Sequence, residues 1–234
     1  MKRLVPRLIG LLLGASVLLI SSCGTSSVVP PTPTVSPSPT PSLTTVACVG
    51  DSITLGYGVA STDTYPAQLQ QDLGSRYTVL NFGVGGTTAN SGGNLPYEAQ
   101  PSYQQALVSN AQIVLIMLGT NDAKTPNDAP ALEATFKSEY EKLVQSFIAM
   151  PSHPTVYVMT PIGAVDGNDT IESTLATIIR PQIRQVGADL GLRVIDLESI
   201  LGGNTAYYQA DGIHPVKDGY TLISTAIYKV LAPQ

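Results

Sequence analysis

The stretch IVLIML, residues 113–118, decides the fold because all six of its residues are apolar. A strand with apolar residues on both faces is typical of the middle of a parallel sheet, where helices cover both sides. Other apolar runs of strand length precede and follow it, and segments with the period of a helix lie between them. With right-handed crossovers, this alternation predicts an α/β fold, a three-layer α/β/α sandwich of about five parallel strands.

The expected elements occupy residues 44–234, which we predict to form one domain because neither a second linker nor an internal repeat interrupts them. The predicted strands are residues 44–49, 77–82, 113–118, 156–159 and 193–197. The predicted helices are residues 65–73, 103–109, 131–150, 170–190 and 215–231. Ligands bind at the carboxyl ends of the strands in such a sheet, so the segments that follow the strands are where chemistry is expected.

Residues 1–22 have the composition of an export signal. The basic residues Lys2, Arg3 and Arg7 precede an apolar run at residues 8–20, which is too short to span a bilayer comfortably, and two serines follow it. The segment ISSC, residues 20–23, resembles a bacterial lipobox, and this resemblance implies a lipoprotein with its lipid anchor on Cys23. The alternative is an ordinary cleaved signal with an incidental Cys23, which predicts a secreted protein.

The residues after Cys23 predict a spacer. Residues 24–43 are rich in Pro, Ser and Thr and have neither charge nor a periodic apolar face, so we expect residues 23–43 to form a disordered tether. A lipid anchor and a tether together predict an exported protein held at the membrane of the bacterial cell envelope.

The charge and the cysteines exclude several classes of partner. Without the three basic residues of the signal, 9 Lys and Arg remain against 17 Asp and Glu, a net charge of −8. This acidic balance, without basic clusters, argues against binding of nucleic acid. The remaining thiol, Cys48, lies in the apolar run VACVG and is expected to be buried, so no disulfide framework exists. We expect a monomer without a cofactor.

Four polar motifs follow predicted strands. They are GDSIT at 50–54, NFGVGGTT at 81–88, GTND at 119–122 and DGIHP at 211–215. Each motif alone fits a turn. Together, at one edge of a sheet, they supply a hydroxyl nucleophile, backbone and amide N–H donors, an acid and a base.

The order of these motifs over residues 50–215 resembles the SGNH, or GDSL, hydrolase superfamily. The resemblance implies a flavodoxin-like α/β/α serine esterase that cleaves esters or thioesters without a metal. It makes Ser52 the nucleophile, His214 the base and Asp211 the residue that orients His214. These roles suit the chemistry, because a serine hydroxyl is a weak nucleophile and needs a base that a carboxylate holds in place.

The same resemblance assigns the oxyanion hole to the backbone N–H of Ser52, to Gly86 and to Asn121. Gly83 and Gly85 compete with Gly86, which is favoured as the sixth residue of the block that starts at Asn81. Fixed donors of this kind are often the largest catalytic contribution.

Other kinds of site fit less well. DGIHP read as a metal site needs further ligands, and the only other histidine, His153, lies in a Pro-flanked loop, so no metal is expected. The sequence has no G-x-S-x-G nucleophile elbow and no G-x-G-x-x-G dinucleotide fingerprint after a strand. DGIHP is also suited to the start of a helix, with Pro215 at the first helical position.

The substrate is predicted from softer features. Residues 118–124 and 156–164 resemble bacterial members that remove O-acetyl groups from carbohydrates, so short-chain or O-acetyl esters on carbohydrate are favoured. The loop 87–102, with Asn90, Asn94, Tyr97 and the nearby Tyr103, has groups of the kind that bind sugars, although a polar surface loop explains it equally. A lysophospholipase or acyl-thioesterase is the enzymatic alternative, and a non-catalytic glycan-binding module of the envelope is the alternative from another class.

Overall fold

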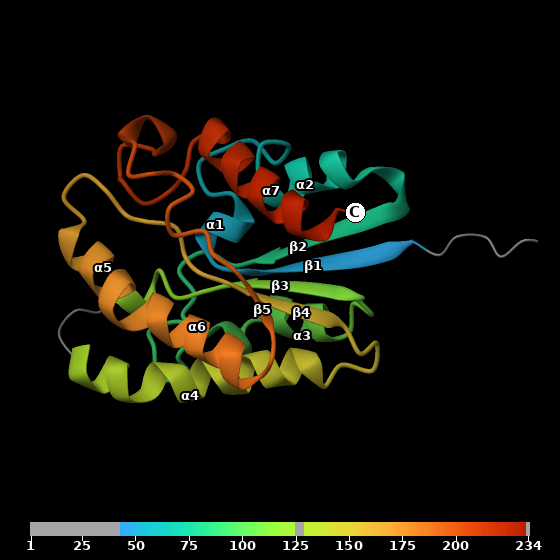
Figure 1. Cartoon of the computed structure of the whole chain (residues 1–234), viewed down its shortest axis with the longest axis horizontal. Helices are drawn as coiled ribbons and strands as arrows, with labels where there is room; N and C mark the ends of the chain where they lie inside the picture. The colour runs from blue at the N-terminus through green and yellow to red at the C-terminus, as the bar shows by residue number, and fades with distance from the viewer. Residues whose placement is uncertain (1–42, 125–128, 233–234) are drawn as a thin grey trace, which may run out of the picture. The chain divides into compact units, whose positions relative to one another are not determined.

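The computed structural model describes residues 43–124 and 129–232, so the predictions for the signal peptide, Cys23 and most of the tether lie outside the described residues. The described chain forms a five-stranded parallel sheet in the order β2-β1-β3-β4-β5 (Figure 1). This is the flavodoxin-like order, and the predicted fold class is confirmed. The strands are β1 (Thr44–Gly50), β2 (Tyr77–Gly83), β3 (Ile113–Met117), β4 (Thr155–Met159) and β5 (Arg193–Ile195).

The strand register brings three of the polar motifs to one edge of the sheet. Gly50, the last residue of β1, pairs with Gly83 of β2 on one side and with Met117 of β3 on the other. The segments after these three strands therefore begin side by side. The GDSIT, NFGVGGTT and GTND motifs lie at these three strand ends.

Helices cover both faces of the sheet (Figure 1). Val46 and Cys48 of β1 pack into the cluster under α1, α2 and α7, whereas Ala47 and Val49 pack into the cluster under α3, α4 and α6. This alternation is the reason that a central strand must be apolar at every position. The helices are α1 (Ser52–Leu55), α2 (Tyr65–Leu73), α3 (Pro101–Leu107), α4 (Ala129–Ile148), α5 (Asp169–Thr174), α6 (Arg180–Asp189) and α7 (Lys217–Leu231), with a π-helical turn η5 (Leu175–Ile179) and 3-10 turns η1 (Gly74–Arg76), η2 (Tyr97–Ala99), η3 (Asp122–Lys124) and η6 (Thr205–Tyr207).

Most predicted elements lie within two residues of the observed ones. Helix α2 coincides with the predicted residues 65–73, because the Thr64 hydroxyl caps it by accepting from the N–H of Ala67 at 3.3 Å and Pro66 lies in its first turn. Over residues 43–124 and 129–232, no helix combines the length and the apolar composition that a membrane crossing requires.

Three helix predictions need correction. Helix α3 begins at Pro101, two residues before the predicted start, because a proline is well suited to the first turn. Pro215 is not the first residue of α7. It forms an antiparallel bridge with Tyr208, and the helix starts at Lys217. The predicted helix 170–190 is interrupted by the π-helical turn η5, which no periodicity in the sequence indicates.

Candidate active site

Ser52 lies where β1 turns into the short helix α1. Asp51 caps this helix, since its Oδ1 accepts the N–H of Ile53 at 2.9 Å. The turn is tight: a Cβ on Gly50 would lie 2.6 Å from the carbonyl oxygen of Met117. The Ser52 side chain is thereby held at the edge of the sheet with only 7% of its surface exposed.

The DGIHP turn brings an imidazole and a carboxylate to this hydroxyl. The Nε2 atom of His214 lies 2.8 Å from Oγ of Ser52, and its Nδ1 atom lies 2.6 Å from Oδ2 of Asp211. The other oxygen of Asp211 accepts the backbone N–H groups of Ile213 and His214 at 2.9 and 3.0 Å. The structure thus joins the three residues predicted as a catalytic group, although Ser52 and His214 are 162 residues apart in the chain.

Hydrogen bonds keep the Asp211 carboxylate ionised. Burial by itself raises the pKa of Asp211, but the bonds from the ring and the backbone N–H of His214 and from the N–H of Ile213 bring the pKa below its usual value. An ionised Asp211 at neutral pH can accept the Nδ1 proton of His214, which leaves Nε2 free to accept a proton from Ser52.

His214 has a second support that sequence analysis did not identify. The ring of Tyr57 lies 4.5 Å from the His214 ring, centroid to centroid. Gln209 donates its backbone N–H to the carbonyl of His214 at 2.8 Å. Its side chain donates to the carbonyls of Tyr57 and Pro215. Tyr57 lies five residues after Ser52 in the sequence, and this closeness is the one signal that could have indicated its contact with His214.

The three glycines of NFGVGG have different surroundings. A Cβ on Gly83 would lie 2.2 Å from the backbone nitrogen of Leu55, so Gly83 allows α1 to pack closely. A Cβ on Gly85 would lie 3.9 Å from Cβ of Ser52, which places this loop beside the hydroxyl. Gly86 has a φ of 80°, which favours glycine, and within the described ranges neither its N–H nor that of Gly85 donates to a protein acceptor. An unengaged N–H is what an oxyanion donor requires.

Asn121 is fixed against the same loop. Its Nδ2 donates to the carbonyl of Thr87 at 2.9 Å, and the side chain is 7% exposed. Because an amide nitrogen carries two hydrogens, one N–H is still available after this bond. The structure therefore brings Asn121 and the Gly86 loop together, as the sequence predicted.

Two buried acids support these loops, and sequence analysis gave them no role beyond turns. Asp122 accepts the N–H groups of Ala89 and Asn90, both at 2.9 Å, and so ties the loop after β3 to the loop after β2. Burial raises the pKa of Asp122 to about 6. Burial also raises the pKa of Asp51 to about 6, although bonds and charges around it act in the opposite direction.

A cavity of about 320 Å³ lies between the loop 87–102, Asp122 and the start of α4, and its volume is within the size range of small-molecule sites. Its lining residues are Thr88, Asn90, Gly92, Gly93, Asn94, Asp122, Ala131, Leu132 and Thr135. Asn90 and Asn94, predicted as sugar-binding groups, are among them. The same prediction is wrong for Tyr97, which is 1% exposed and donates to the carbonyl of Phe82 at 2.7 Å. Tyr103 packs edge-on against Tyr97 in the core.

The other candidates for metal ligands lie apart. His153 is exposed in the turn before β4, and Cys48 is fully buried, which raises the pKa of its thiol to about 12. Among the residues that the structure describes, no three His, Cys, Asp or Glu side chains gather where they could hold a metal ion.

A serine hydroxyl bonded to a histidine, which is bonded in turn to a carboxylate, defines the class of serine hydrolases. Residues 48–222 match the GDSL-like Lipase/Acylhydrolase family, and the chain belongs to this family. It is therefore a hydrolase of the SGNH/GDSL esterase type.

Individual relatives agree with this assignment. The chain is 32% identical over 203 residues to an acetylxylan esterase of Xylanibacter ruminicola, an alignment that covers 78% of this chain but 42% of that protein, so the chain spans less than half of its length. The fold is similar to a lipase/acylhydrolase from Enterococcus faecalis, with a TM-score of 0.62, 23% identity and coverage of 81% of this chain and 95% of that one. It is also similar to a carbohydrate acetylesterase family member from Sinorhizobium meliloti, with a TM-score of 0.59, 21% identity and coverage of 81% and 97%.

Proposed function

We propose that this protein hydrolyses O-acyl esters with Ser52 as the nucleophile, His214 as the general base and Asp211 as the residue that orients His214. The observation that carries the proposal is the continuous chain of short contacts, 2.8 Å from Ser52 to His214 and 2.6 Å from His214 to Asp211. These distances are within the hydrogen-bond reach that proton transfer needs.

The reaction takes place in two halves. Oγ of Ser52 attacks the acyl carbon while His214 takes its proton, and His214 then returns this proton to the leaving alcohol, so an acyl-serine remains. Water, deprotonated by His214, attacks the acyl carbon, and His214 gives this proton to Oγ of Ser52 as the acyl–oxygen bond breaks, which releases the carboxylic acid and regenerates Ser52. Asp211 stabilises the imidazolium that forms in each half.

The negative oxygen of each tetrahedral intermediate needs donors that are already in place. We assign them to the backbone N–H groups of Ser52 and Gly86 and to the side-chain N–H of Asn121. The unengaged N–H of Gly86 and the fixed amide of Asn121 support this assignment. A single donor of this kind typically contributes about 10² to 10³ in rate.

Short-chain esters, in particular O-acetyl groups on carbohydrate, are the proposed substrates. Two observations support them: the similarity to an acetylxylan esterase, and the cavity beside Asp122, whose lining includes hydroxyl and amide groups that suit a sugar. One observation favours a second candidate, a lysophospholipase or acyl-thioesterase. The large apolar side chains Leu55, Tyr57 and Leu95 are exposed near Ser52, Gly85 and Gly86, where they could contact an acyl chain.

Export and attachment to the cell envelope through a lipid on Cys23 remain a proposal, supported by the signal-like residues 1–22 and the lipobox-like ISSC. Mass spectrometry of the mature N-terminus tests it. A diacylglycerol mass on Cys23 supports the anchor, and an unmodified cysteine points to a secreted enzyme.

Hydrolysis of p-nitrophenyl acetate, octanoate and palmitate tests the reaction and the acyl length together, followed by acetylated xylan against a lysophospholipid. We expect the acetate and acetylated xylan to be preferred. Ser52→Ala and His214→Ala should abolish hydrolysis and labelling by a fluorophosphonate, while Ser75→Ala, at an exposed serine between α2 and β2, should change neither. A folded Ser52→Ala protein that retained more than a few per cent of the wild-type rate would refute the proposed nucleophile.

A further inference from the structure

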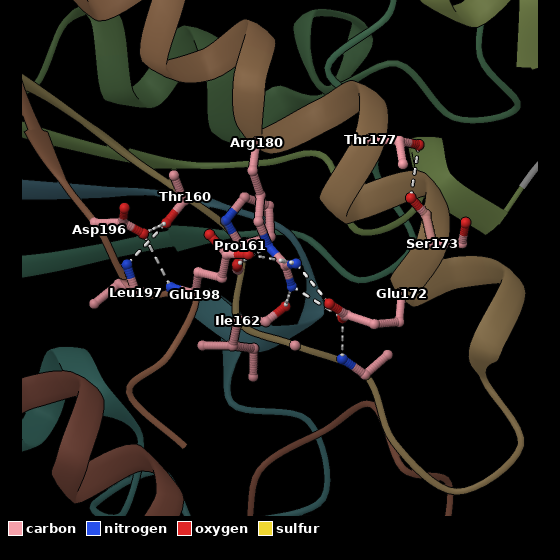
Figure 2. A network of polar contacts seen from close by, with 12 residues as sticks. Thr160, Pro161, Ile162, Glu172, Ser173, Thr177, Arg180, Asp196, Leu197 and Glu198 are labelled. Carbon is pink, nitrogen blue, oxygen red and sulfur yellow. Dashed lines mark hydrogen bonds and ion pairs between the residues drawn. The ribbon is translucent and has the colours of Figure 1, made fainter. Parts of the chain in front are cut away.

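Arg180 is a buried arginine whose every donor is engaged. Its side chain is 0% exposed at the start of α6. Nε donates to the carbonyl of Pro161 at 3.1 Å and Nη2 to the carbonyl of Ile162 at 3.1 Å. The remaining donors contact Glu172 and, at 3.4 Å, Glu198 (Figure 2). Five N–H groups therefore have five acceptors, which is the full capacity of a guanidinium.

Glu172 binds the guanidinium with both oxygens, at 2.6 and 3.0 Å. Oε2 also accepts the backbone N–H of Ala164 at 2.9 Å. Partial burial raises the pKa of Glu172, but the bonds from Arg180 and Ala164 outweigh it and the pKa lies below its usual value. The pair thus bonds to three backbone groups of one segment: the carbonyls of Pro161 and Ile162, and the N–H of Ala164.

The π-helical turn η5 explains how Glu172 and Arg180 come to share one side of the helix. Residues eight apart on an ideal α-helix lie about 80° apart around its axis. A π-helical turn accommodates one additional residue, so the pair behaves as if it were seven apart, at about 20°. Since η5 lies between them, the bulge aligns both side chains with the segment after β4.

Hydrogen bonds join this segment, residues 161–165, to the turn that carries Asp211 and His214. The N–H of Val165 donates to the carbonyl of Gly212 at 2.8 Å. The side chain of Asn168 donates both to the carbonyl of Val165 at 2.6 Å and to the carbonyl of Asp211 at 2.8 Å. A Cβ on Gly212 would lie 2.2 Å from the Val165 carbonyl oxygen, so the two segments are in close backbone contact.

We infer that Arg180 and Glu172 are positioning residues for catalysis: through residues 161–165 and Asn168 they fix the backbone at Asp211 and Gly212, and so hold the Asp211 carboxylate against His214. His214 also has supports that do not involve residues 161–165: the ring of Tyr57, from the turn after α1, and the N–H of Gln209, which donates to the carbonyl of His214. The effect of the Arg180–Glu172 pair on the reaction therefore passes through Asp211. This inference rests on the proposed function of Ser52, His214 and Asp211.

Glu172→Gln is the primary test, because Glu172 is part-exposed and the change keeps its size while it removes the charge that binds Arg180. We expect kcat for p-nitrophenyl acetate to fall about ten- to hundredfold, the range for a misplaced catalytic group, with KM within about twofold of wild type. Asn168→Ala, which removes the last link to Asp211, should lower kcat in the same way. It tests the inference independently if Glu172→Gln does not fold, as judged by its thermal melt.

Glu198→Gln is the matched control. It removes a carboxylate from the same guanidinium, at 3.4 Å, but within the described residues the Glu198 side chain bonds to Arg180 and Arg184 and to no residue of 161–165. We expect its kcat to stay within about twofold of wild type. A loss in Glu198→Gln equal to that in Glu172→Gln would overturn the inference, because it would show a general effect of charge loss around Arg180.

A second readout separates positioning from general support of the fold. In an Asp211→Ala background, Glu172→Gln and Asn168→Ala should each lower kcat by less than about threefold, since the group that they position is gone. An undiminished loss in that background, or unchanged kcat in the folded single variants, overturns the inference while the proposed function stands. If the wild-type protein itself shows no Ser52-dependent hydrolysis, the proposed function fails, and the inference that rests on it fails too.

Discussion

Asp51→Asn should stabilise the protein at alkaline pH and leave its stability unchanged in acid. Asp51 is 0% exposed, so its carboxylate is removed from water. Burial raises its pKa from 3.8 to about 6. Between these values the folded protein binds a proton that the unfolded chain has lost, so stability falls as the pH rises through this window.

The magnitude follows from the two pKa values. The difference between 3.8 and about 6 corresponds to about 3 kcal/mol once Asp51 is ionised in both states, at ~1.4 kcal/mol per pKa unit. Asparagine keeps the cap on Ile53 and carries no charge, and its N–H can donate to the neighbouring Thr120 hydroxyl. We therefore expect Asp51→Asn to gain up to about 3 kcal/mol at pH 8 and nothing at pH 4.

Urea unfolding of wild type and Asp51→Asn at pH 4 and pH 8, at fixed ionic strength, measures this difference. Asp166→Asn, at an exposed carboxylate, is the control and should change stability by less than about 0.5 kcal/mol at either pH. A gain that is equal at both pH values would refute the argument from ionisation. So would a loss of stability at pH 8.

Three further predictions concern the site and its supports. Asn121→Ala should lower kcat for p-nitrophenyl acetate about 10²- to 10³-fold with little change in KM, as measured by steady-state kinetics, because it removes a proposed oxyanion donor. Gly212→Ala should destabilise the protein by more than about 1 kcal/mol in urea and lower kcat, since its φ of 66° disfavours alanine and the new Cβ would lie 2.2 Å from the carbonyl oxygen of Val165. Tyr97→Phe should cost about 1 kcal/mol in thermal unfolding through its lost bond to Phe82, and it should leave activity on acetylated xylan unchanged, because Tyr97 is a core residue.

The parts of the fold that could be predicted are those that local sequence determines. A strand segment buried on both faces must be apolar, and residues 46–49 of β1 and all of β3 show this in the sequence. Helix α2 coincides with its predicted bounds because its start is fixed locally, by a capping threonine and a proline two residues apart. The start of α7 was wrong because Pro215 pairs with Tyr208, a contact that depends on the tertiary fold.

The same distinction applies to the site. Ser52, Asp211 and His214 could be predicted because each belongs to a short motif, and the order of the motifs is specific. Arg180 and Glu172 have no such motif. Their importance depends on burial and on the π-helical turn between them, and an arginine in a helical segment predicts only a solvated surface.

The buried polar groups on the two sides of Ser52 differ in how completely they are hydrogen-bonded. On the Asp211 side, all five N–H groups of the buried Arg180 have acceptors, and two of these acceptors are the carbonyls of Pro161 and Ile162. Behind Ser52, the hydroxyl of Tyr220 is buried without a hydrogen-bond partner within residues 43–124 and 129–232. Burial raises the pKa of the Tyr220 phenol, and the negative charge of the buried Asp51 carboxylate raises it further. A buried polar group without a partner costs about 1–3 kcal/mol, so the region behind Ser52 lowers the stability of the fold, whereas the guanidinium that supports the Asp211 side is fully bonded.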